Sequence, residues 1–413
     1  MSKIDDLIAQ YCPKGVEFKE LGEVILSLKT GLNPRKNFTL NTIDARNFYV
    51  TVRELKGLDI AFHDKTDKVN DEGLKLISNR SKLEKGDVLF SGTGTIGRTA
   101  LVREEPKNWN IKEGVYVIKP NQNLILPLFI LYTLYSPDTV KQIKNKIVGS
   151  PVCSIPMMEL KKVKIPIPPL SIQEEIVNIL NKFTSLEAEL EAELEARTQQ
   201  YVFYRDKLLR FEGKDVKWKS LGEVGTFLRG KRFVRTDMIE EGFPCIHYGE
   251  MYTHYNVFAK QSKSFISEEL ASKLRVANPG DVIIVAAGET IEDIGKGTAW
   301  LGDTDVVTHD ACFSFKSPLN PKYVSYFLRT KLFHNQIRKH ISSGKISAIN
   351  AIGLSKAKIP VPPLAEQNKI VAILDKFDAL VNDISTGLPA EIKARKKQYE
   401  HYRNKLLTFS PIN

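Results

Sequence analysis

The chain contains the same module twice. The stretch from Ile165 to Leu186 reads IPIPPLSIQEEIVNILNKFTSL, and the stretch from Ile359 to Leu380 reads IPVPPLAEQNKIVAILDKFDAL, with thirteen identities in twenty-two positions. Two shorter pairs recur about two hundred residues apart: YRDKLLRF returns as YRNKLLTF, and VEFKELGEV returns as VKWKSLGEV. A period this long indicates a duplicated domain rather than an array of short repeats. The sequence therefore predicts two similar modules, each a globular part followed by a helix.

The globular part of each module mixes strand and helix patterns. In the first copy, β-rich runs such as DVLF and GVYVIK precede the helical stretch LPLFILYTLYSPDTVKQIKNKI. In the second copy, GDVIIVAAG and ACFSFK precede PKYVSYFLRTKLFHNQIRKHI in the same order. Each globular part has roughly 145 residues, which is a common domain size. We expect two α+β domains whose edges are similar and whose middles differ.

A proline-rich segment, IPxPPL, leads from each globular part into a long helix. Proline fixes φ and favours extended geometry before it, so the helix should begin after this segment, with Ser171 as the N-cap of the first copy. Apolar residues three or four apart predict one long helix with a coiled-coil seam from about Ile172 to Leu209. The second helical region should break at STGLP, where Gly387 can end one helix and Pro389 can begin the next.

A four-residue unit distinguishes the two helical regions. LEAELEAELEA, from Leu186 to Ala196, repeats a tetrapeptide nearly three times. The offset between the copies is 194 from Ile165 to Ile359, but 198 from Tyr204 to Tyr402. Each unit adds about 6 Å of helix. The tandem is either a plain Glu-rich solvated face or, as we expect, also a ruler whose length changes in steps.

The chain carries a formal net charge of +11, which favours a polyanionic partner such as nucleic acid. Basic and small polar residues gather in expected loops, where they could contact phosphates or bases. For any single residue, a solvated surface position is the alternative. The candidate DNA-binding residues are Arg35, Lys36, Lys65, Lys68, Thr93, Thr95, Arg98, Lys231, Arg232, Arg235, Ser343 and Lys345.

The remaining composition narrows the class of protein. The sequence has no run of eighteen apolar residues and no signal-peptide core at its start, so we expect a cytoplasmic protein. The four cysteines lack CxxC spacing, which favours reduced thiols over disulfides or a metal site. The isolated pair Cys245 and His247 is too small a set for a metal centre.

Three motifs suggest enzymes and fail on their context. GTGTIG, from Gly92 to Gly97, fits a dinucleotide fingerprint, but no helix pattern opens there and no acidic residue follows at the required distance. FSGTG resembles a methyl-donor loop, but the chain lacks the polar-Pro-Pro-aromatic loop that grips a flipped base. A forced PD…ExK pattern does not fall on paired strands. We therefore expect no catalytic residue and no cofactor in this chain.

Several motifs together resemble the specificity subunit of type I restriction–modification systems, over essentially the whole chain. They are CPKGVEFKELGEV, both IPxPPLxxQxxIVxIL segments, the LEAE tandem and GLPAEIKARKKQYEHYRNKLLTF. The resemblance implies an internal pseudo-two-fold repeat of two target-recognition domains and two long, coiled-coil-like helical spacers. The implied boundaries are 1–165 for the first domain, 166–212 for the first spacer, 213–359 for the second domain and 360–413 for the second spacer.

The resemblance also implies a function. Each domain would read one half of an asymmetric, bipartite double-stranded DNA site, and the helices would dock two methyltransferase subunits, which restriction subunits then join. S-adenosylmethionine, ATP and Mg²⁺ would belong to those partners. The residues expected on the docking helices are Gln173, Ile176, Phe183, Tyr204, Gln367, Ile370, Phe377 and Tyr402. The alternatives are an orphan DNA-binding scaffold or regulator without modification partners, and a self-contained enzyme.

Overall fold

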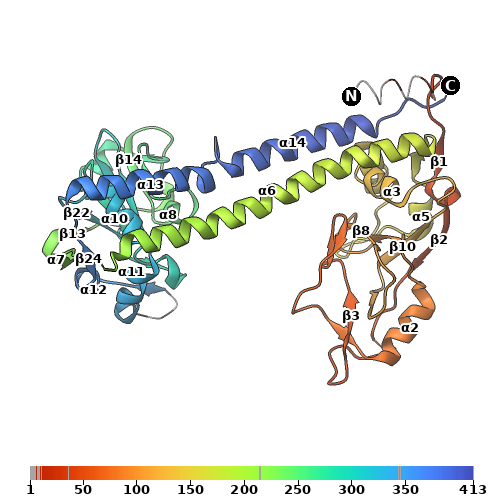
Figure 1. Ribbon diagram of the computed structural model, residues 1–413, viewed down its shortest axis with the longest axis horizontal. Helices are drawn as coiled ribbons and strands as arrows, with labels where there is room; N and C mark the ends of the chain where they lie inside the picture. The colour runs from red at the N-terminus through yellow and green to blue at the C-terminus, as the bar shows by residue number, and fades with distance from the viewer. Residues whose placement is uncertain are drawn as a thin grey trace. The chain divides into compact units, whose positions relative to one another are not determined.

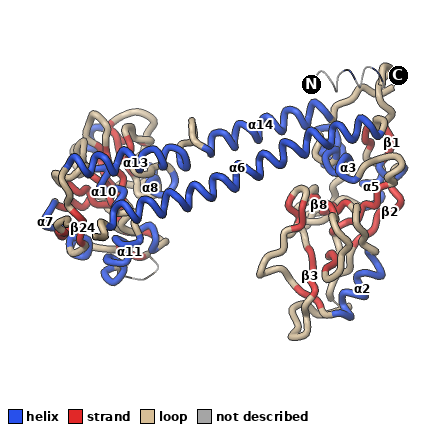
Figure 2. The backbone as a smooth tube through the Cα atoms, in the orientation of Figure 1, coloured by secondary structure: helices blue, strands red, loops and turns tan. Residues whose placement is uncertain are grey.

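The computed structural model describes residues 6, 10, 12–35, 37–213, 215–342, 344 and 346–412. The chain forms two compact units. The first takes in the chain up to Glu189 and again from Lys393, and the second runs from Leu190 to Ile392. Both units mix helices with strands, which confirms the predicted α+β class (Figures 1 and 2).

The first unit contains a four-stranded antiparallel sheet in the order β2-β10-β7-β8. A three-stranded sheet has the order β6-β3-β9, in which β3 and β9 run parallel. The predicted runs DVLF and GVYVIK form β7 and β10, which pair with each other. The elements are β1 (Phe18–Glu20), η1 (Leu21–Glu23), β2 (Ile25–Thr30), β3 (Asn47–Val50), β4 (Leu55–Lys56), β5 (Asp59–Ile60), β6 (Lys68–Val69), α2 (Asp71–Ser81), β7 (Val88–Ser91), β8 (Thr99–Leu101), β9 (Trp109–Ile111), β10 (Val115–Pro120), α3 (Pro127–Thr133), α4 (Pro137–Lys144), α5 (Met157–Lys161) and β11 (Lys164–Pro166).

The second unit repeats this arrangement with one more strand at an edge of each sheet. Its sheets have the orders β13-β22-β18-β20-β15 and β16-β14-β21-β17, and β14 runs parallel to β21 as β3 does to β9. The elements are β12 (Trp218–Ser220), α7 (Leu221–Val224), β13 (Thr226–Arg229), η2 (Arg235–Asp237), β14 (Phe243–Ile246), α8 (Glu250–Thr253), β15 (Phe258–Ala259), β16 (Ser264–Ile266), α9 (Glu268–Ala271), β17 (Val276–Ala277), β18 (Val282–Val285), β19 (Ala287–Gly288), η3 (Ile291–Asp293), β20 (Gly297–Trp300), β21 (Val306–Thr308), β22 (Cys312–Lys316), α10 (Pro321–Phe327), α11 (Lys331–Ile337), η4 (Arg338–His340), β23 (Ser347–Ala348), α12 (Ala351–Ser355) and β24 (Lys358–Pro360).

A two-stranded antiparallel ladder closes each globular part. β1 pairs with β11 in the first unit, and β12 pairs with β24 in the second. The chain therefore enters and leaves each globular part through neighbouring strands. The proline-rich segment follows the second of these strands and leads into α6 (Leu170–Arg210) or α13 (Leu364–Asn382).

A buried glutamine fastens the start of each long helix to its globular part. Gln173 accepts the N–H of Leu126 at 2.9 Å and donates to the Pro168 carbonyl at 2.8 Å. Gln367 accepts the N–H of Asn320 at 2.9 Å and donates to a proline carbonyl at 2.8 Å in the same way. These bonds satisfy a carbonyl of the irregular lead-in and the N–H of the residue that precedes α3 or α10.

The predicted N-cap is wrong. Helix α6 begins at Leu170, so Ser171 lies inside its first turn and cannot cap it from outside. The Pro169 carbonyl already accepts the N–H groups of Ile172 and Gln173. The double proline therefore sets the start of the helix two residues earlier than the side-chain preference of serine suggests.

The helical region of each repeat contributes to both compact units. Helix α6 belongs to the first unit up to Glu189 and to the second from Leu190. Helix α14 (Leu388–Leu406) belongs to the first unit from Lys393. Each unit thus combines the start of one repeat's helical region with the end of the other's. The four segments predicted from the sequence divide the chain in linear order, whereas the compact units combine parts of these segments.

The cores of the units show this exchange directly. In the first unit, Leu406 and Leu407 of the second repeat are buried in one cluster with Ile176 and Leu180 of the first. In the second unit, Tyr201 and Leu209 of the first repeat are buried in one cluster that also holds Ile370 and Leu374. These side chains are buried only in a core that also contains residues of the other repeat. The two repeats therefore stabilise each other.

An aromatic stack joins the two helices in each unit. The rings of Phe183 and Tyr402 lie 5.3 Å apart between centroids in the first unit, at an angle of 26°. The rings of Phe377 and Tyr204 lie 5.4 Å apart in the second, at 21°. Phe377 corresponds to Phe183 in the repeat, and Tyr204 corresponds to Tyr402. The pairs are therefore equivalent and reciprocal, as in the interface of a two-fold dimer.

The helices of each pair run antiparallel. In the first unit, Phe183 meets Tyr402, while one turn further along α6 the Glu187 carboxylate lies 3.3 Å from the ammonium of Lys396. In the second unit, Tyr201 donates to the Asp378 carboxylate at 3.3 Å, beside the stack of Tyr204 on Phe377. Numbering rises along one helix as it falls along the other.

The predicted break at STGLP is confirmed. Helix α13 ends at Asn382, α14 begins at Leu388, and Pro389 occupies its second position. The Asp383 carboxylate accepts the N–H of Ser385 at 2.7 Å, and this and related hydrogen bonds lower the pKa of Asp383 to about 2. A Cβ at Gly387 would lie 2.5 Å from the Ala379 carbonyl oxygen, so the turn requires glycine.

The two ends of the described chain pair with each other in the first unit. The N–H of Val16 donates to the Ser410 carbonyl at 2.8 Å, and the N–H of Ile412 donates back to Val16 at 3.2 Å. Between the repeats, the corresponding residues Glu212 and Val216 are joined by the chain itself. Hydrogen bonds thus replace at the termini the covalent connection between the repeats.

We expect Gln367→Ala to lower the free energy of unfolding of the second unit by about 1–3 kcal/mol, because it leaves the partners of a buried amide unpaired. Denaturant unfolding of the whole chain measures this change. The control is Gln199→Ala, which removes an exposed amide from α6 in the same unit and should stay within about 0.5 kcal/mol of the wild type. Equal unfolding midpoints for both variants would contradict the role given to Gln367.

Candidate functional site

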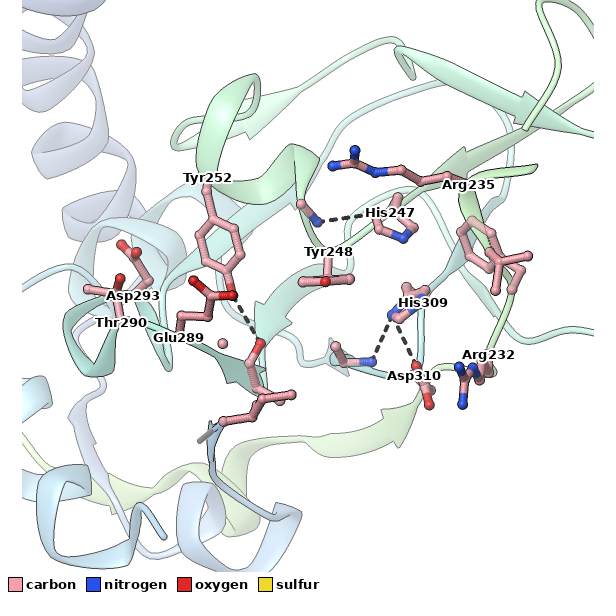
Figure 3. A pocket seen from close by; sticks show the side chains of 17 residues that line it. Arg232, Arg235, His247, Tyr248, Tyr252, Glu289, Thr290, Asp293, His309 and Asp310 are labelled. Atoms are coloured by element: carbon pink, nitrogen blue, oxygen red, sulfur yellow. Dashed lines mark hydrogen bonds and ion pairs between the residues drawn. The ribbon is translucent and has the colours of Figure 1, made fainter. Parts of the chain in front are cut away.

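Each unit carries a pocket at the same place in its fold. In the first unit, a pocket of about 340 Å³ lies among the segment after β2, the segment after β3 and the turn from β9 to β10. In the second unit, a pocket of about 710 Å³ lies among the corresponding segments after β13, after β14 and between β21 and β22 (Figure 3). We call these the first and second pockets.

The lining of the two pockets differs. The first pocket is lined by Asn33, Pro34, Leu40, Tyr49, Thr51, Val52, Arg53, Asp67, Thr93, Lys112, Glu113, Gly114 and Val115. The second pocket is lined by Arg232, Phe233, Val234, Arg235, His247, Tyr248, Gly249, Tyr252, Ala287, Gly288, Glu289, Thr290, Asp293, His309, Asp310, Ala311 and Ile346.

The scaffold beneath the pockets is the same in both units. A buried glutamate holds the turn after β3 or β14: Glu54 accepts the N–H of Thr51 at 2.8 Å, and Glu250 accepts the N–H of His247 at 3.0 Å. The other carboxylate oxygen accepts a hydroxyl, from Thr66 in the first unit and from Ser264 in the second. Such bonds offset the cost of burying the carboxylate and fix the turn that presents the lining residues.

A glycine lets two segments approach closely below each pocket. A Cβ at Gly31 would lie 1.9 Å from the Ile111 carbonyl oxygen, and one at Gly230 would lie 2.2 Å from the His309 carbonyl oxygen. No larger residue fits either position without moving backbone. The same constraint at the same place supports the equivalence of the two pockets.

Two buried histidines form the inner wall of the second pocket (Figure 3). The rings of His247 and His309 lie 4.6 Å apart between centroids and are only 6% and 7% exposed. Tyr248 lies against both imidazoles, at 4.6 Å and 5.0 Å, and Phe233 meets them edge-on. The four rings form one aromatic cluster, of which Tyr248 is exposed.

Hydrogen bonds determine which ring nitrogen of each imidazole carries the proton. Nδ1 of His247 accepts the N–H of Gly249 at 3.2 Å, and Nδ1 of His309 accepts the N–H of Ala311 at 3.1 Å. A neutral ring that accepts at Nδ1 carries its proton on Nε2. Among the described residues, the His309 ring also bonds the Phe233 backbone carbonyl, whereas no described bond uses Nε2 of His247. The pocket therefore offers the N–H of His247 as a donor.

Burial keeps both rings neutral. It lowers the pKa of His247 and of His309 below the ordinary value, because the interior disfavours the charged imidazolium. The Asp310 carboxylate lies 3.0 Å from Nδ1 of His309 and opposes this shift, but the effect of burial is the larger. Both histidines are thus uncharged near pH 7.

Two arginines lie at the exposed edge of the second pocket. The guanidinium of Arg235 lies beside Gly249 and His247, and Arg232 lies on the side of His309 (Figure 3). Both side chains are exposed, and in the part of the chain that the structure describes neither has a carboxylate within ion-pair distance. They are free to bind an external acceptor, to which the planar guanidinium can donate two parallel hydrogen bonds.

The first pocket has different chemistry. Arg53 donates to the Asp67 carboxylate at 2.9 Å and so is already paired. Tyr49 is buried and donates to the Leu32 carbonyl at 2.7 Å. Lys112 and Glu113 stand in the turn between β9 and β10. The first pocket thus mixes donors and acceptors, whereas its counterpart is rich in donors.

The structure brings three of the predicted DNA-binding residues into the pockets: Thr93 in the first, and Arg232 and Arg235 in the second. Two more of the predicted residues, Arg35 and Arg98, are exposed beside the first pocket. Arg35 follows Pro34 in the chain, and Arg98 donates to the Val52 carbonyl at 3.3 Å. Their DNA-binding role stays a prediction.

The other predicted residues are scattered. Lys65 and Thr95 are exposed in turns, Lys68 lies on β6 with its ammonium 5.4 Å from the centre of the Phe48 ring, and the Lys231 ammonium donates to the Lys273 carbonyl at 2.8 Å. Lys36, Ser343 and Lys345 lie outside the described residues.

Four of the residues expected on docking surfaces are buried. Gln173, Ile176, Gln367 and Ile370 are at most 3% exposed, and they fasten helices to their own globular parts. This corrects their assignment, because a partner subunit has no access to them. The aromatic residues Phe183, Tyr204, Phe377 and Tyr402 are partly accessible, but they are used in the stacks between helices.

Sequence reasoning missed most of the lining residues, including Arg53, Lys112, His247, Tyr248 and His309. The one signal available was the glutamate three residues after Thr51 and after His247, which aligns the turns TVRE and HYGE between the copies. The rejected dinucleotide motif was interpreted correctly: Gly92 to Gly97 forms the turn between antiparallel β7 and β8, with no helix opening there.

Among the described residues, no group of three or more His, Cys, Asp or Glu side chains could hold a metal ion. The four cysteines are free thiols, and three of them are buried. No described helix has the length and apolar character needed to cross a membrane.

Comparison with known proteins identifies the family. A family model described as the type I restriction modification DNA specificity domain matches residues 13–196 and 213–394. The chain belongs to this family. The two matches correspond to the two repeats, and the resemblance inferred from the motifs is confirmed.

Two relatives are named specificity subunits. The chain is 37% identical over 261 residues to the EcoR124I/EcoR124II specificity subunit of Escherichia coli, covering 60% of this chain and 63% of the relative. It is 34% identical over 268 residues to a putative specificity subunit of Haemophilus influenzae, covering 61% and 65%. The chain thus spans less than two thirds of the length of these relatives.

A solved structure supports the fold. It is described as the structural basis of complex assembly and conformational transition of the type I R-M system, and it matches with a TM-score of 0.61 at 20% identity. The match covers 96% of this chain and 98% of the other. The chain therefore shares its fold with that structure over nearly its whole length.

We expect the second unit to lose stability as the pH falls below about 6.5, because the unfolded chain then protonates histidines that stay neutral in the fold. The loss is at most about 1.4 kcal/mol per pH unit for each histidine. Denaturant unfolding at several pH values measures it. His309→Phe should flatten this dependence, and the exposed His254→Phe should not; the same slope in both variants would contradict the inference.

Proposed function

We propose that this chain is the DNA-recognition subunit of a type I restriction–modification complex and that each unit reads one half of a bipartite, asymmetric site. The observation that carries the proposal is the pair of equivalent pockets, which share a scaffold and differ in lining. A repeated fold places two readers in related positions, and different linings read different sequences. The net charge of +11 suits a polyanionic ligand.

The helices are the proposed docking surface for two methyltransferase subunits, through which restriction subunits join. In the second unit, exposed apolar side chains remain on α6 and α13 or just after it: Phe203 is 59% exposed, Ile373 44% and Ile384 82%. Exposed apolar groups of this size on helices are typical of protein interfaces. They replace the buried positions expected from the sequence.

Chemistry is proposed to reside in the partners. Adenine methylation would use S-adenosylmethionine in the methyltransferase subunits, and cleavage would use ATP and Mg²⁺ in the restriction subunits. This chain supplies recognition and assembly. The proposal rests on the resemblance of its motifs to the family and on the absence of a base-gripping Pro-Pro loop from the sequence.

Co-expression with the methyltransferase subunit encoded beside it tests the proposal. We expect a stable complex that methylates adenine within a single split motif, while the purified chain with methyl donor or Mg²⁺ does nothing. Sequencing of the methylated host DNA gives the motif. A chain that binds DNA but forms no complex would be the orphan scaffold, and activity of the chain alone would make it a self-contained enzyme.

The LEAE tandem carries a second prediction, since the boundary between the compact units falls inside it, at Glu189 and Leu190. Inserting one more LEAE after Ala196 adds about 6 Å of helix, or one to two base-pair steps of about 3.4 Å. We expect the methylated motif to keep both half-sites and to gain one or two base pairs in the gap. Altered half-sites at constant spacing would refute the ruler.

A further inference from the structure

We infer that the second pocket reads a guanine–cytosine base pair in one half-site through the guanidiniums of Arg232 and Arg235 and the imidazole of His247. This rests on the proposed function and adds the ligand chemistry of one reader. The major-groove edge of guanine presents two acceptors, N7 and O6, and no donor. The pocket presents the matching set of donors.

The donors converge from two depths. Arg232 and Arg235 are exposed at the mouth, and the described chain gives neither an acidic partner. Arginine forms two parallel hydrogen bonds to guanine, and this is the commonest specific contact between protein and DNA. Deeper in the pocket, the rings of His247 and His309 lie 4.6 Å apart, and Nε2 of His247 has no described acceptor. Adenine, which offers a donor beside its acceptor, would leave one of these groups unpaired.

One carboxylate supplies the complementary reading of cytosine. Glu289 lies at the edge of the same pocket, is exposed, and has no described ion-pair partner. Carboxylates accept a hydrogen bond from the N4 amino group of cytosine. Of the other two acids, Asp293 pairs with Lys296 at 2.5 Å, and Asp310 lies 3.0 Å from Nδ1 of His309. The two arginines and Glu289 therefore match both bases of the pair.

The comparison of repeats argues against a phosphate as the ligand. Phosphates are the same along any sequence, so a phosphate site would need the same chemistry in both units. The scaffold is kept, with Glu54 and Glu250 in equivalent bonds, but the residues above it change. His247 stands where the first unit has Thr51, and His309 stands where it has Lys112. A kept scaffold with a changed lining is what two different base sequences require.

The experiment uses the assembled complex with its methyltransferase subunit and a panel of duplexes that carry each base pair at every position of both half-sites. In Arg235→Gln, we expect preference for one G·C pair to fall by roughly 5- to 150-fold, with the other half-site read as before. His247→Phe keeps the ring and removes the N–H donor, so it should relax the same position. A purely structural defect would weaken binding without changing which base is preferred.

Two variants serve as controls. Arg338→Gln removes an exposed arginine from the same unit outside the pocket and should leave every preference unchanged. Arg53→Gln, in the first pocket, should change the other half-site only. Uniform weakening in Arg235→Gln, with a shallower salt dependence by about one counterion, would mean a phosphate contact and overturn the inference. Unchanged preference in Arg235→Gln and His247→Phe would also overturn it. A wild-type complex without any sequence preference would overturn the proposed function as well.

Discussion

The structure depends on an antiparallel helix pair that neither repeat can supply alone. Phe183 stacks on Tyr402 in one unit, and Phe377 stacks on Tyr204 in the other. Each stack joins the start of one helical region to the end of the other, and the cores around them bury leucines from both. A chain duplicated in this way behaves as a two-fold dimer whose subunits have been linked and then allowed to diverge.

Each pocket consists of two layers, and the chemical difference between the two pockets lies in the upper one. The lower layer is backbone held by a buried carboxylate and by glycines that accept close contact, as at Gly31 and Gly230. A change there disturbs the sheet. The upper layer consists of side chains that project from fixed turns. The position held by Thr51 in the first unit can therefore be held by His247 in the second without a shift of any strand. Function can change quickly in the upper layer because stability resides in the lower one.

The sequence predicted what depends on local pattern. The duplication, the α+β class, the long helix and the break before Leu388 follow from identities, spacing, glycine and proline. The pockets could not be predicted, because Tyr248 and His309 meet only through the parallel pairing of β14 with β21, which no local pattern specifies. The same limit misplaced Gln173: a glutamine on a helix suggests a surface, and only the packed junction shows it buried. Positive charge marked Arg232 and Arg235 as candidates, but charge alone did not distinguish these pocket residues from Lys65, which lies in an exposed turn.

The ladder of β1 with β11, and that of β12 with β24, has an evolutionary consequence. Along the chain, all the residues that line each pocket lie between the two strands of its ladder. Genetic exchange of the segment between the codons of these two strands would replace one pocket as a cassette, while the long helices keep their sequence. Such a chain can change the lining of one pocket in a single recombination event, without any substitution in its helix pairs.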